Sequence, residues 1–188
     1  MELLEGLLSR RSVAPKDMTP DAPSAEELQQ ILTAALRVPD HGKLGPWRIR
    51  VFDKQAQEAF GSIVAERFKQ RTPEATEPQI AFEKTRPARA PLMLAVLATP
   101  VEDKAPIWEQ HLSAGALCQN MLNACHALGY GAKWLTEWIA YDGAIIEALG
   151  GKKGDRIAGF IYIGKANAVP EERVRPGIGD VVSAWKAG

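Results

Sequence analysis

The chain has 188 residues, enough for one domain with a full hydrophobic core and no need of disulfides or metals to hold it. It contains 23 Lys plus Arg and 23 Asp plus Glu, so no basic excess would attract nucleic acid or anionic lipid. The longest apolar run, residues 92–98, is too short to span a membrane, and the N-terminus lacks the basic region of a signal peptide. We therefore expect a single domain over residues 1–188, soluble and cytoplasmic, with neither nucleic acid nor membrane as a partner.

The first third of the chain reads as helices separated by proline-rich connections. A short helix is predicted at residues 2–9, followed by an irregular stretch at 13–23. Ser24 then opens a second helix, because Glu27 stands three residues on in a capping box. The residue before Pro39 is pushed out of the helical region, so this helix is expected to end there.

The next segment alternates strand and helix. A strand is predicted at 47–52, a helix near 55–69, and a second strand at 92–98. That second strand is apolar at every position, which suits a strand covered on both faces. The polar, proline-broken stretch between, residues 70–91, is the part of the chain that we expect to be most mobile.

A long helix over residues 106–128 is apolar around most of its circumference, which is typical of a helix buried in a core or an oligomer interface. Its two cysteines, Cys118 and Cys125, lie about 10 Å apart along the axis, too far for a disulfide, and are interpreted as inert core thiols. Two glycines follow this helix, and we expect them to bring Trp134, Leu135 and Thr136 together at one site. Gly129 and Gly131 let the backbone turn sharply, but they follow a helix, so a Rossmann glycine motif is not supported.

The last elements complete the layers. Asp142 is a good N-cap for a helix to residue 149, the Gly-Gly-Lys-Lys-Gly stretch at 150–154 is interpreted as a cap and turn, and a third strand is predicted at 156–164. Helices then cover both sides of one sheet, an α+β arrangement. The tail from Ala166 ends in apolar residues without local partners, which favours docking elsewhere, for instance on a second subunit.

Few residues can carry chemistry. Arg10, Arg11 and Ser12 follow a helix and combine two guanidinium forks with a hydroxyl, a set that suits a phosphate; the alternative is that arginines simply favour the end of a helix. His41, in the PDHGKLGPW loop after Arg37, is a candidate ligand donor, a general acid, or a solvated side chain. No nucleophile motif or metal-ligand spacing is present, so redox or group-transfer chemistry would belong to a cofactor.

Together, Arg10-Arg11-Ser12, the PDHGKLGPW loop, the SAGALCQNMLNACHALGYGAKWLT helix and GFIYIGKA at 159–166 resemble the FMN-dependent nitroreductase family. The likeness runs in order over nearly the whole chain and is greatest to the family's small, compact NAD(P)H nitroreductases. It implies a three-layer α+β fold with a central mixed, mainly antiparallel sheet flanked by helices. It also implies an intertwined homodimer that holds one FMN at each end of its interface, with residues from both subunits.

The resemblance also implies roles for particular residues. Arg10, Arg11 and Ser12 would bind the phosphate and ribityl oxygens of FMN, and Arg37 and His41 would make a second contact, with His41 coming from the partner subunit. Trp134, Leu135 and Thr136 would lie along the flavin. The stretch assigned to NADH or NADPH comprises Ala124, Cys125, His126, Ala127, Leu128 and Gly129. No catalytic side chain is expected, since the flavin carries the chemistry.

The sequence departs from the family at two places. Many relatives have an Asn and a Gln where this chain has Gly42–Gly45, and a Lys near the flavin N1 where it has Ala14; Lys16 or Lys43 are the candidate substitutes. Without that cation the reduced flavin should be less stable, its potential lower, and turnover with ordinary nitroaromatics poor.

Three functions therefore stay open. The first is an FMN-dependent NAD(P)H oxidoreductase that reduces nitro compounds, quinones or similar acceptors by a ping-pong cycle. The second is an FMN enzyme of the same fold with another reaction, such as substrate dehydrogenation or flavin chemistry. The third is a flavin-free dimeric binding protein.

Overall fold

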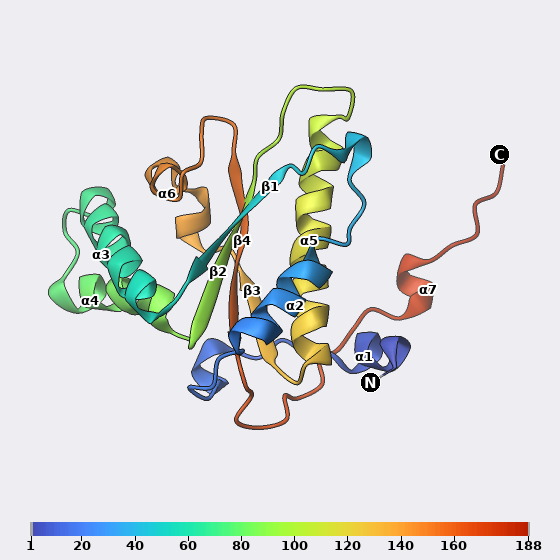
Figure 1. Ribbon diagram of the computed structural model, residues 1–188, viewed down its shortest axis with the longest axis horizontal. Helices are drawn as coiled ribbons and strands as arrows, with labels where there is room; N and C mark the ends of the chain where they lie inside the picture. Colours follow the sequence, from blue (N-terminus) through green and yellow to red (C-terminus); the bar gives the residue numbers. More distant parts are fainter. Residues whose placement is uncertain (1, 188) are drawn as a thin grey trace.

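A four-stranded antiparallel sheet forms the centre of the molecule (Figure 1). The computed structural model describes residues 2–187, and in it the strands run in the order β1-β2-β4-β3. Their bounds are Trp47–Phe52 for β1, Leu92–Ala98 for β2, Gly131–Leu135 for β3 and Arg156–Gly164 for β4. Residues from three distant parts of the chain therefore meet in one sheet, and β2 and β4 lie in its middle.

The two central strands are buried on both faces, as their sequences predict. Every residue of β2 is buried, and Phe160 to Ile163 of β4 are fully buried. One face carries Leu94, Val96 and Ile161, and the other carries Met93 and Phe160. Two separate cores result, one on each side of the sheet.

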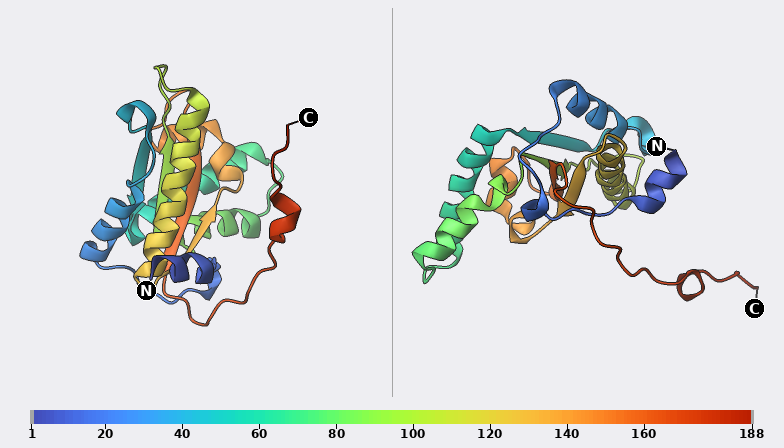
Figure 2. Two further views of the ribbon diagram at one scale, coloured as in Figure 1. Left: turned by 90° about the vertical axis from the view of Figure 1, so that its right-hand side faces the viewer. Right: turned by 90° about the horizontal axis from the view of Figure 1, so that it is seen from below.

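Helices cover both faces, which confirms the three-layer α+β prediction (Figure 2). The first core lies beneath α2 (Ala25–Ala35) and α5 (Ile107–Ala127), and the second lies beneath α3 (Lys54–Arg71) and α6 (Gly143–Ala148). The capping box of Ser24 and Glu27 is present, and Asp142 caps α6 by accepting from the N–H groups of Ala144 and Ile145. None of the helices described here is long and apolar enough to cross a membrane.

The stretch over residues 70–91 is more regular than its sequence indicates. It forms α4 (Glu77–Thr85) and the 3-10 turn η3 (Arg86–Ala88), which pack against α3. The reason is tertiary: Gly61 lets the two helices approach so closely that a Cβ on it would lie 2.1 Å from the carbonyl oxygen of Lys84. Residues 77–88 are therefore helical although no helix was predicted there, and the mobility expected of residues 70–91 stays a prediction.

Three smaller features also differ from the expectations or extend them. Residues 131–135 form strand β3 rather than a turn, because β4 offers them an antiparallel partner. Helix α2 stops at Ala35, so Arg37 lies beyond its end. Short 3-10 turns stand at Pro15–Asp17 (η1), His41–Lys43 (η2) and Trp138–Tyr141 (η4).

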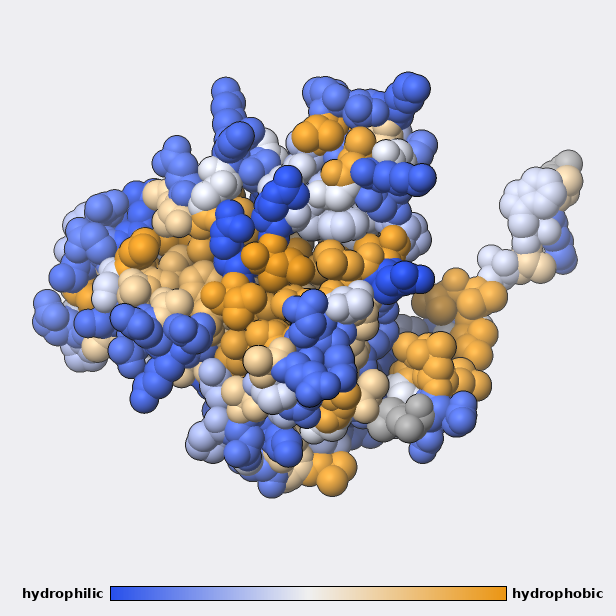
Figure 3. Space-filling view, viewed as in Figure 1, coloured by the Kyte–Doolittle hydropathy of each residue, from blue (hydrophilic) through white to orange (hydrophobic). Residues whose placement is uncertain are grey.

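Both ends of the described chain carry apolar side chains that their own subunit leaves uncovered. Helix α1 (Leu3–Ser9) buries no residue, and its four leucines are between 50% and 76% exposed. The tail after β4 contains only the short helix α7 (Ile178–Val181) and leaves Trp185 87% exposed. Hydrophobic side chains gather over α1 and α7 at the right of the space-filling view (Figure 3).

Candidate functional site

The arginine pair lies where α1 meets the last turn of α5 and the start of β3. Ser12 forms a parallel bridge with Ala132, and the N–H of Val13 donates to the carbonyl of Ala132 at 3.2 Å. Val13 occupies the space beside Gly131, because a Cβ on that glycine would stand 2.6 Å from its Cγ2. Gly131 thus allows the N-terminal segment to dock on the sheet edge, and this docking places Arg10 and Arg11.

The side chains at this junction form a positively charged cluster. Burial lowers the pKa of the Arg10 guanidinium, and the charges of Arg175 and Arg11 lower it further. The Nε2 atom of His126 lies 3.1 Å from the Oγ of Ser9, and burial, Arg10 and Arg11 all lower the pKa of this imidazole. Since each shift disfavours the charged form, an anion bound here would relieve the repulsion. Guanidinium forks match the geometry of a phosphate.

Arg11 is held in place by its own chain. Its Nη1 donates to the carbonyls of Leu8 and Arg10, both at 2.8 Å, and its Nη2 forms an ion pair with Glu172 of the tail. The side chain of Arg11 is 20% exposed and that of Glu172 is 61% exposed. An exposed carboxylate is weakly bound, so this pair leaves Arg11 able to exchange its partner for another anion.

Trp134 and Leu135 end the same strand, and Thr136 follows it directly. The Nε1–H of Trp134 donates to the carbonyl of Ala158 at 2.9 Å, and its indole lies over Gly159. The hydroxyl of Tyr141 donates to the Oγ1 of Thr136 at 3.2 Å. Because Ser12 pairs with Ala132, these three residues continue along the sheet edge from the arginine pair.

The end of α5 divides into core and surface residues. Cys125 is fully buried, Ala124 and Leu128 pack against the same core, and burial raises the pKa of the Cys125 thiol to about 12. Ala127 and Gly129 are exposed, and His126 faces the arginine pair. Of the six residues expected to contact NAD(P)H, His126, Ala127 and Gly129 are the ones accessible from outside the core.

His41 lies at the other end of α5, whereas Arg37 lies beside its middle, where its carbonyl accepts from the Nδ2 of Asn120 at 3.2 Å. The Nδ1 of His41 stands 2.7 Å from the Oε2 of Glu109, in the first turn of that helix, while His126 is in its last turn. At 1.5 Å per residue the two positions are about 25 Å apart along the axis. One chain therefore does not bring His41 together with the arginine pair.

The loop that carries His41 is tightly folded. The carboxylate of Asp40 accepts from the N–H groups of Leu44 and Gly45 at 3.1 and 2.9 Å, and Gly42 has φ +79°. Ser113 of α5 fastens the loop by donating to the carbonyl of Pro39. The stretch Gly42–Gly45 has no amide side chain and offers backbone groups and Lys43.

Trp134 also borders a cavity of about 470 Å³ between α5 and β4. Trp108, His111 and Gly115 line it from α5, and Arg156 lines it from β4. Sequence reasoning did not single out Trp108, His111 or Arg156 for a site. The helical spacing of Trp108, His111 and Gly115 is the signal that would have placed them on one face of α5.

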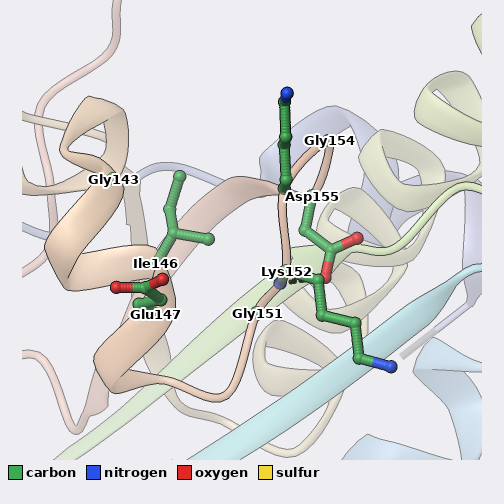
Figure 4. A pocket seen from close by; sticks show the side chains of 8 residues that line it. Gly143, Ile146, Glu147, Gly151, Lys152, Gly154 and Asp155 are labelled. Carbon is green, nitrogen blue, oxygen red and sulfur yellow. Dashed lines mark hydrogen bonds between the residues drawn. The ribbon is translucent and has the colours of Figure 1, made fainter.

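The glycine- and lysine-rich stretch after α6 is a cap and turn, as predicted. Gly150 has φ +81°, and the N–H of Lys152 donates to the Oδ2 of Asp155 at 2.8 Å. The turn and α6 enclose a hollow of about 280 Å³ lined by Glu147, Lys152 and Asp155 (Figure 4). A strand rather than a helix follows it, so it lacks the architecture of a phosphate loop.

Comparison with known proteins settles the family. The family model described as "Nitroreductase family" matches residues 7–165, from the end of α1 to the end of β4. The chain belongs to the nitroreductase family. The matched region contains the arginine pair, α5 and β3.

Individual relatives agree with this membership. The chain is 36% identical over 167 residues to the Escherichia coli K12 protein named "Putative NAD(P)H nitroreductase YdjA", covering 87% of this chain and 88% of that protein. It is 31% identical over 182 residues to a Haemophilus influenzae protein with the same nitroreductase description, covering 93% and 94%.

Solved structures share the fold. A nitroreductase-like protein from Bacillus cereus superposes with a TM-score of 0.82 at 20% identity, covering 100% of this chain and 97% of that one. A Desulfovibrio desulfuricans protein of the family, solved in complex with FMN, superposes with a TM-score of 0.74 at 23% identity, covering 98% and 97%.

Proposed function

We propose that this chain is a single-domain, FMN-dependent NAD(P)H oxidoreductase that reduces nitro compounds, quinones or similar acceptors in a ping-pong cycle. The observation that carries the proposal is the pair of guanidinium groups of Arg10 and Arg11, with His126 beside them, at the start of β3. The nitroreductase names of its relatives and the FMN bound in a structural neighbour support the same cofactors.

The residues present fit FMN. Arg10 and Arg11 would hold its phosphate, Ser12 would donate to the ribityl oxygens, and residues 134–136 would lie along the ring. Bound FMN would accept a hydride from NADH or NADPH and pass electrons to the acceptor. The exposed surface at Ala127 and Gly129 would receive the nicotinamide cofactor, and the apolar surroundings would exclude water from the reduced ring.

A homodimer is part of this proposal, and the exposed apolar surface supports it. The leucines of α1 are uncovered, and on α5 Trp108 is 69% and Leu112 54% exposed. Monomers rarely expose so many large apolar side chains together. A second copy covering α5 would also bring its own His41 toward a site that one chain leaves incomplete, since His41 and His126 are about 25 Å apart along α5 within one chain.

The second candidate keeps FMN but changes the reaction. The loop at Gly42–Gly45 and the alanine at position 14 favour it, because they remove amide and ammonium groups that many relatives direct at the flavin. A flavin of lower potential is a poorer electron acceptor from NAD(P)H. A flavin-free binding protein is disfavoured, because assembly alone needs no cluster of like charges.

FMN titration tests the cofactor assignment. We expect the Arg10→Ala/Arg11→Ala double variant to bind FMN more weakly by at least about tenfold, since each charged hydrogen bond contributes about 1.5–3 kcal/mol. Riboflavin, which lacks the phosphate, should bind wild type and variant equally. Lys69→Ala is the control for loss of a cation, because Lys69 is exposed in the last turn of α3, away from the residues proposed to bind FMN. Unchanged FMN affinity in the double variant contradicts the assignment.

Anaerobic reduction distinguishes the two FMN reactions. The FMN-saturated protein is mixed with NADPH or NADH, and absorbance of the bound flavin is followed. Bleaching, together with parallel double-reciprocal plots against nitro and quinone acceptors, supports the proposed cycle. Flavin that binds but stays oxidised with both cofactors favours the second reaction.

Sedimentation velocity tests the dimer. Wild type should sediment as a dimer at micromolar concentration, and Leu4→Ser/Leu8→Ser should shift it toward the monomer, since both side chains are more than 65% exposed in one chain. A monomeric wild type would contradict the composite site.

A further inference from the structure

The residue directly after the proposed flavin segment has an unusual backbone conformation. Glu137 has φ +55° and ψ −177°. This region is occupied essentially by glycine alone, and other residues there carry strain that persists only when the surrounding structure fixes them. The chain therefore contains something that holds Glu137 in place.

Two arginines hold its carboxylate. Arg89 binds Glu137 bidentately, with Nη2 to Oε2 at 2.6 Å and Nη1 to Oε1 at 3.1 Å. Arg86 donates from Nη1 to the same Oε1 at 2.6 Å. Fork-shaped, charge-assisted contacts of this kind fix geometry as well as adding energy.

The arginines are themselves fixed from the buried side. Arg86 donates from Nε to Glu83 at 2.6 Å, and its side chain is 9% exposed. The fully buried Tyr162 accepts from Arg89 at 3.1 Å and donates to the carbonyl of Arg86 at 3.1 Å. Both arginines therefore have little freedom to follow Glu137 if its backbone moves.

A second contact anchors the next residue to the same group. The Nε1–H of Trp138 donates to the Oε2 of Glu83 at 2.9 Å. Two consecutive side chains, those of Glu137 and Trp138, are thus hydrogen-bonded to α4 and the segment after it. Their partners are Arg86 and Arg89 for Glu137 and Glu83 for Trp138. Two carboxylates and two guanidinium groups balance, so the cluster has no net charge.

We propose that Arg86 and Arg89 are positioning residues, which act through Glu137 to fix the Trp134–Thr136 backbone in the conformation that receives the flavin. This inference rests on the proposed FMN function. The strain lies at Glu137, the second of the two residues that join β3 to η4, and the clamp is what maintains it. A preorganised segment binds its ligand more tightly, because the ordering cost is met on folding.

A pair of substitutions isolates the backbone effect. Glu137→Ala and Glu137→Gly both remove the carboxylate, but only glycine adopts this conformation without a clamp. We expect Glu137→Ala to bind FMN about tenfold more weakly than wild type, and Glu137→Gly to recover most of that loss. Equal affinities for the two variants, whether weak or strong, would overturn the inference.

Hydrogen exchange of the apoprotein provides a readout that needs no flavin. Amides at 136–138 should exchange faster in Arg89→Met and in Glu137→Ala than in wild type. Arg67→Met is the control, because Arg67 binds the buried carboxylate of Asp142 on the neighbouring helix at 2.9 Å without touching this segment. Arg86→Met is measured only where its circular dichroism spectrum matches wild type, and Arg89→Met carries the test otherwise.

The two proposals fail separately. If wild type does not bind FMN, the proposed function fails, while exchange at 136–138 still reports on the clamp. If wild type binds FMN but Arg89→Met matches Arg67→Met in both affinity and exchange, the positioning role is wrong and the proposed function stands.

Discussion

Gly159 provides the sharpest test of how the fold seats the proposed flavin segment. A Cβ built on this residue of β4 would lie 1.9 Å from Nε1 and 2.2 Å from Cδ1 of Trp134. Ordinary contacts begin near 3.4 Å, so in Gly159→Ala the indole must move by about 1.5 Å. Gly115 of α5 also lies beside the Trp134 ring, since a Cβ on Gly115 would stand 3.9 Å from Cη2 of the indole. The indole and Gly115 line the same cavity, so we expect the indole to move into that cavity.

The expected cost combines two terms. Overpacking of this kind costs about 1–3 kcal/mol. The shift also breaks the hydrogen bond from Trp134 to the carbonyl of Ala158, now 2.9 Å long, which contributes about 1 kcal/mol. We therefore expect Gly159→Ala to lower the free energy of unfolding by about 2–4 kcal/mol. FMN affinity should fall as well, because Trp134 belongs to the segment proposed to lie along the ring.

Urea unfolding of the apoprotein measures this cost, and a double-mutant cycle assigns it to the clash. Trp134→Leu removes the ring atoms that meet the new methyl group, so the double variant should be more stable than the sum of the single effects by at least about 1 kcal/mol. Two results would refute the reasoning: a Gly159→Ala protein within about 0.5 kcal/mol of wild type, or single effects that simply add.

Three further predictions follow from other parts of the structure. Cys118 and Cys125 are fully buried, and burial raises the pKa of each thiol to about 12, so Ellman's reagent at pH 8 should label neither until the protein is unfolded. Burial alone would raise the pKa of Asp142, but hydrogen bonds from Arg67 and the α6 backbone outweigh it and lower that pKa. The advantage of wild type over Asp142→Asn in urea unfolding should therefore be full at neutral pH and shrink as the pH falls below about 4, where the carboxylate of the unfolded chain is protonated first. It should be lost once the pH falls through the lower pKa of the native carboxylate. Gly61→Ala should destabilise by about 1–3 kcal/mol, because its methyl group would meet the carbonyl oxygen of Lys84 and separate α3 from α4; stability equal to wild type would contradict this packing.

Local signals in the sequence predicted most of the layers. The capping box at Ser24, the N-cap at Asp142 and the apolar strands at 92–98 and 156–164 all appear as expected. These features depend on neighbours within a few residues, which a single sequence displays directly. Family resemblance added that the sheet is mainly antiparallel, which pattern alone left open.

Elements that depend on distant partners were missed. Strand β3 is five residues long and exists because β4 pairs with it, and α4 is fixed by the close approach of its last turn to Gly61. Strand preference in particular reflects cross-strand packing more than the backbone's own tendency. The charged clamp has the same origin: Glu137 meets Arg86 and Arg89 from positions 51 and 48 residues away, and nothing in the sequence near either end marks the pairing.

The site shows the same division between what is local and what is assembled. Arg10, Arg11 and His126 were assigned to two different cofactors from the family resemblance, yet they lie together at one end of α5. His41 was assigned to the same cofactor as the arginine pair, yet it lies at the opposite end of that helix, while Arg37 lies between them beside Asn120. The rigid helix holds His41 about 25 Å from His126, so no rearrangement of loops within one chain unites His41 with the arginine pair. Under the proposed function, only a second copy can complete the site, and cofactor binding and subunit association would then reinforce one another.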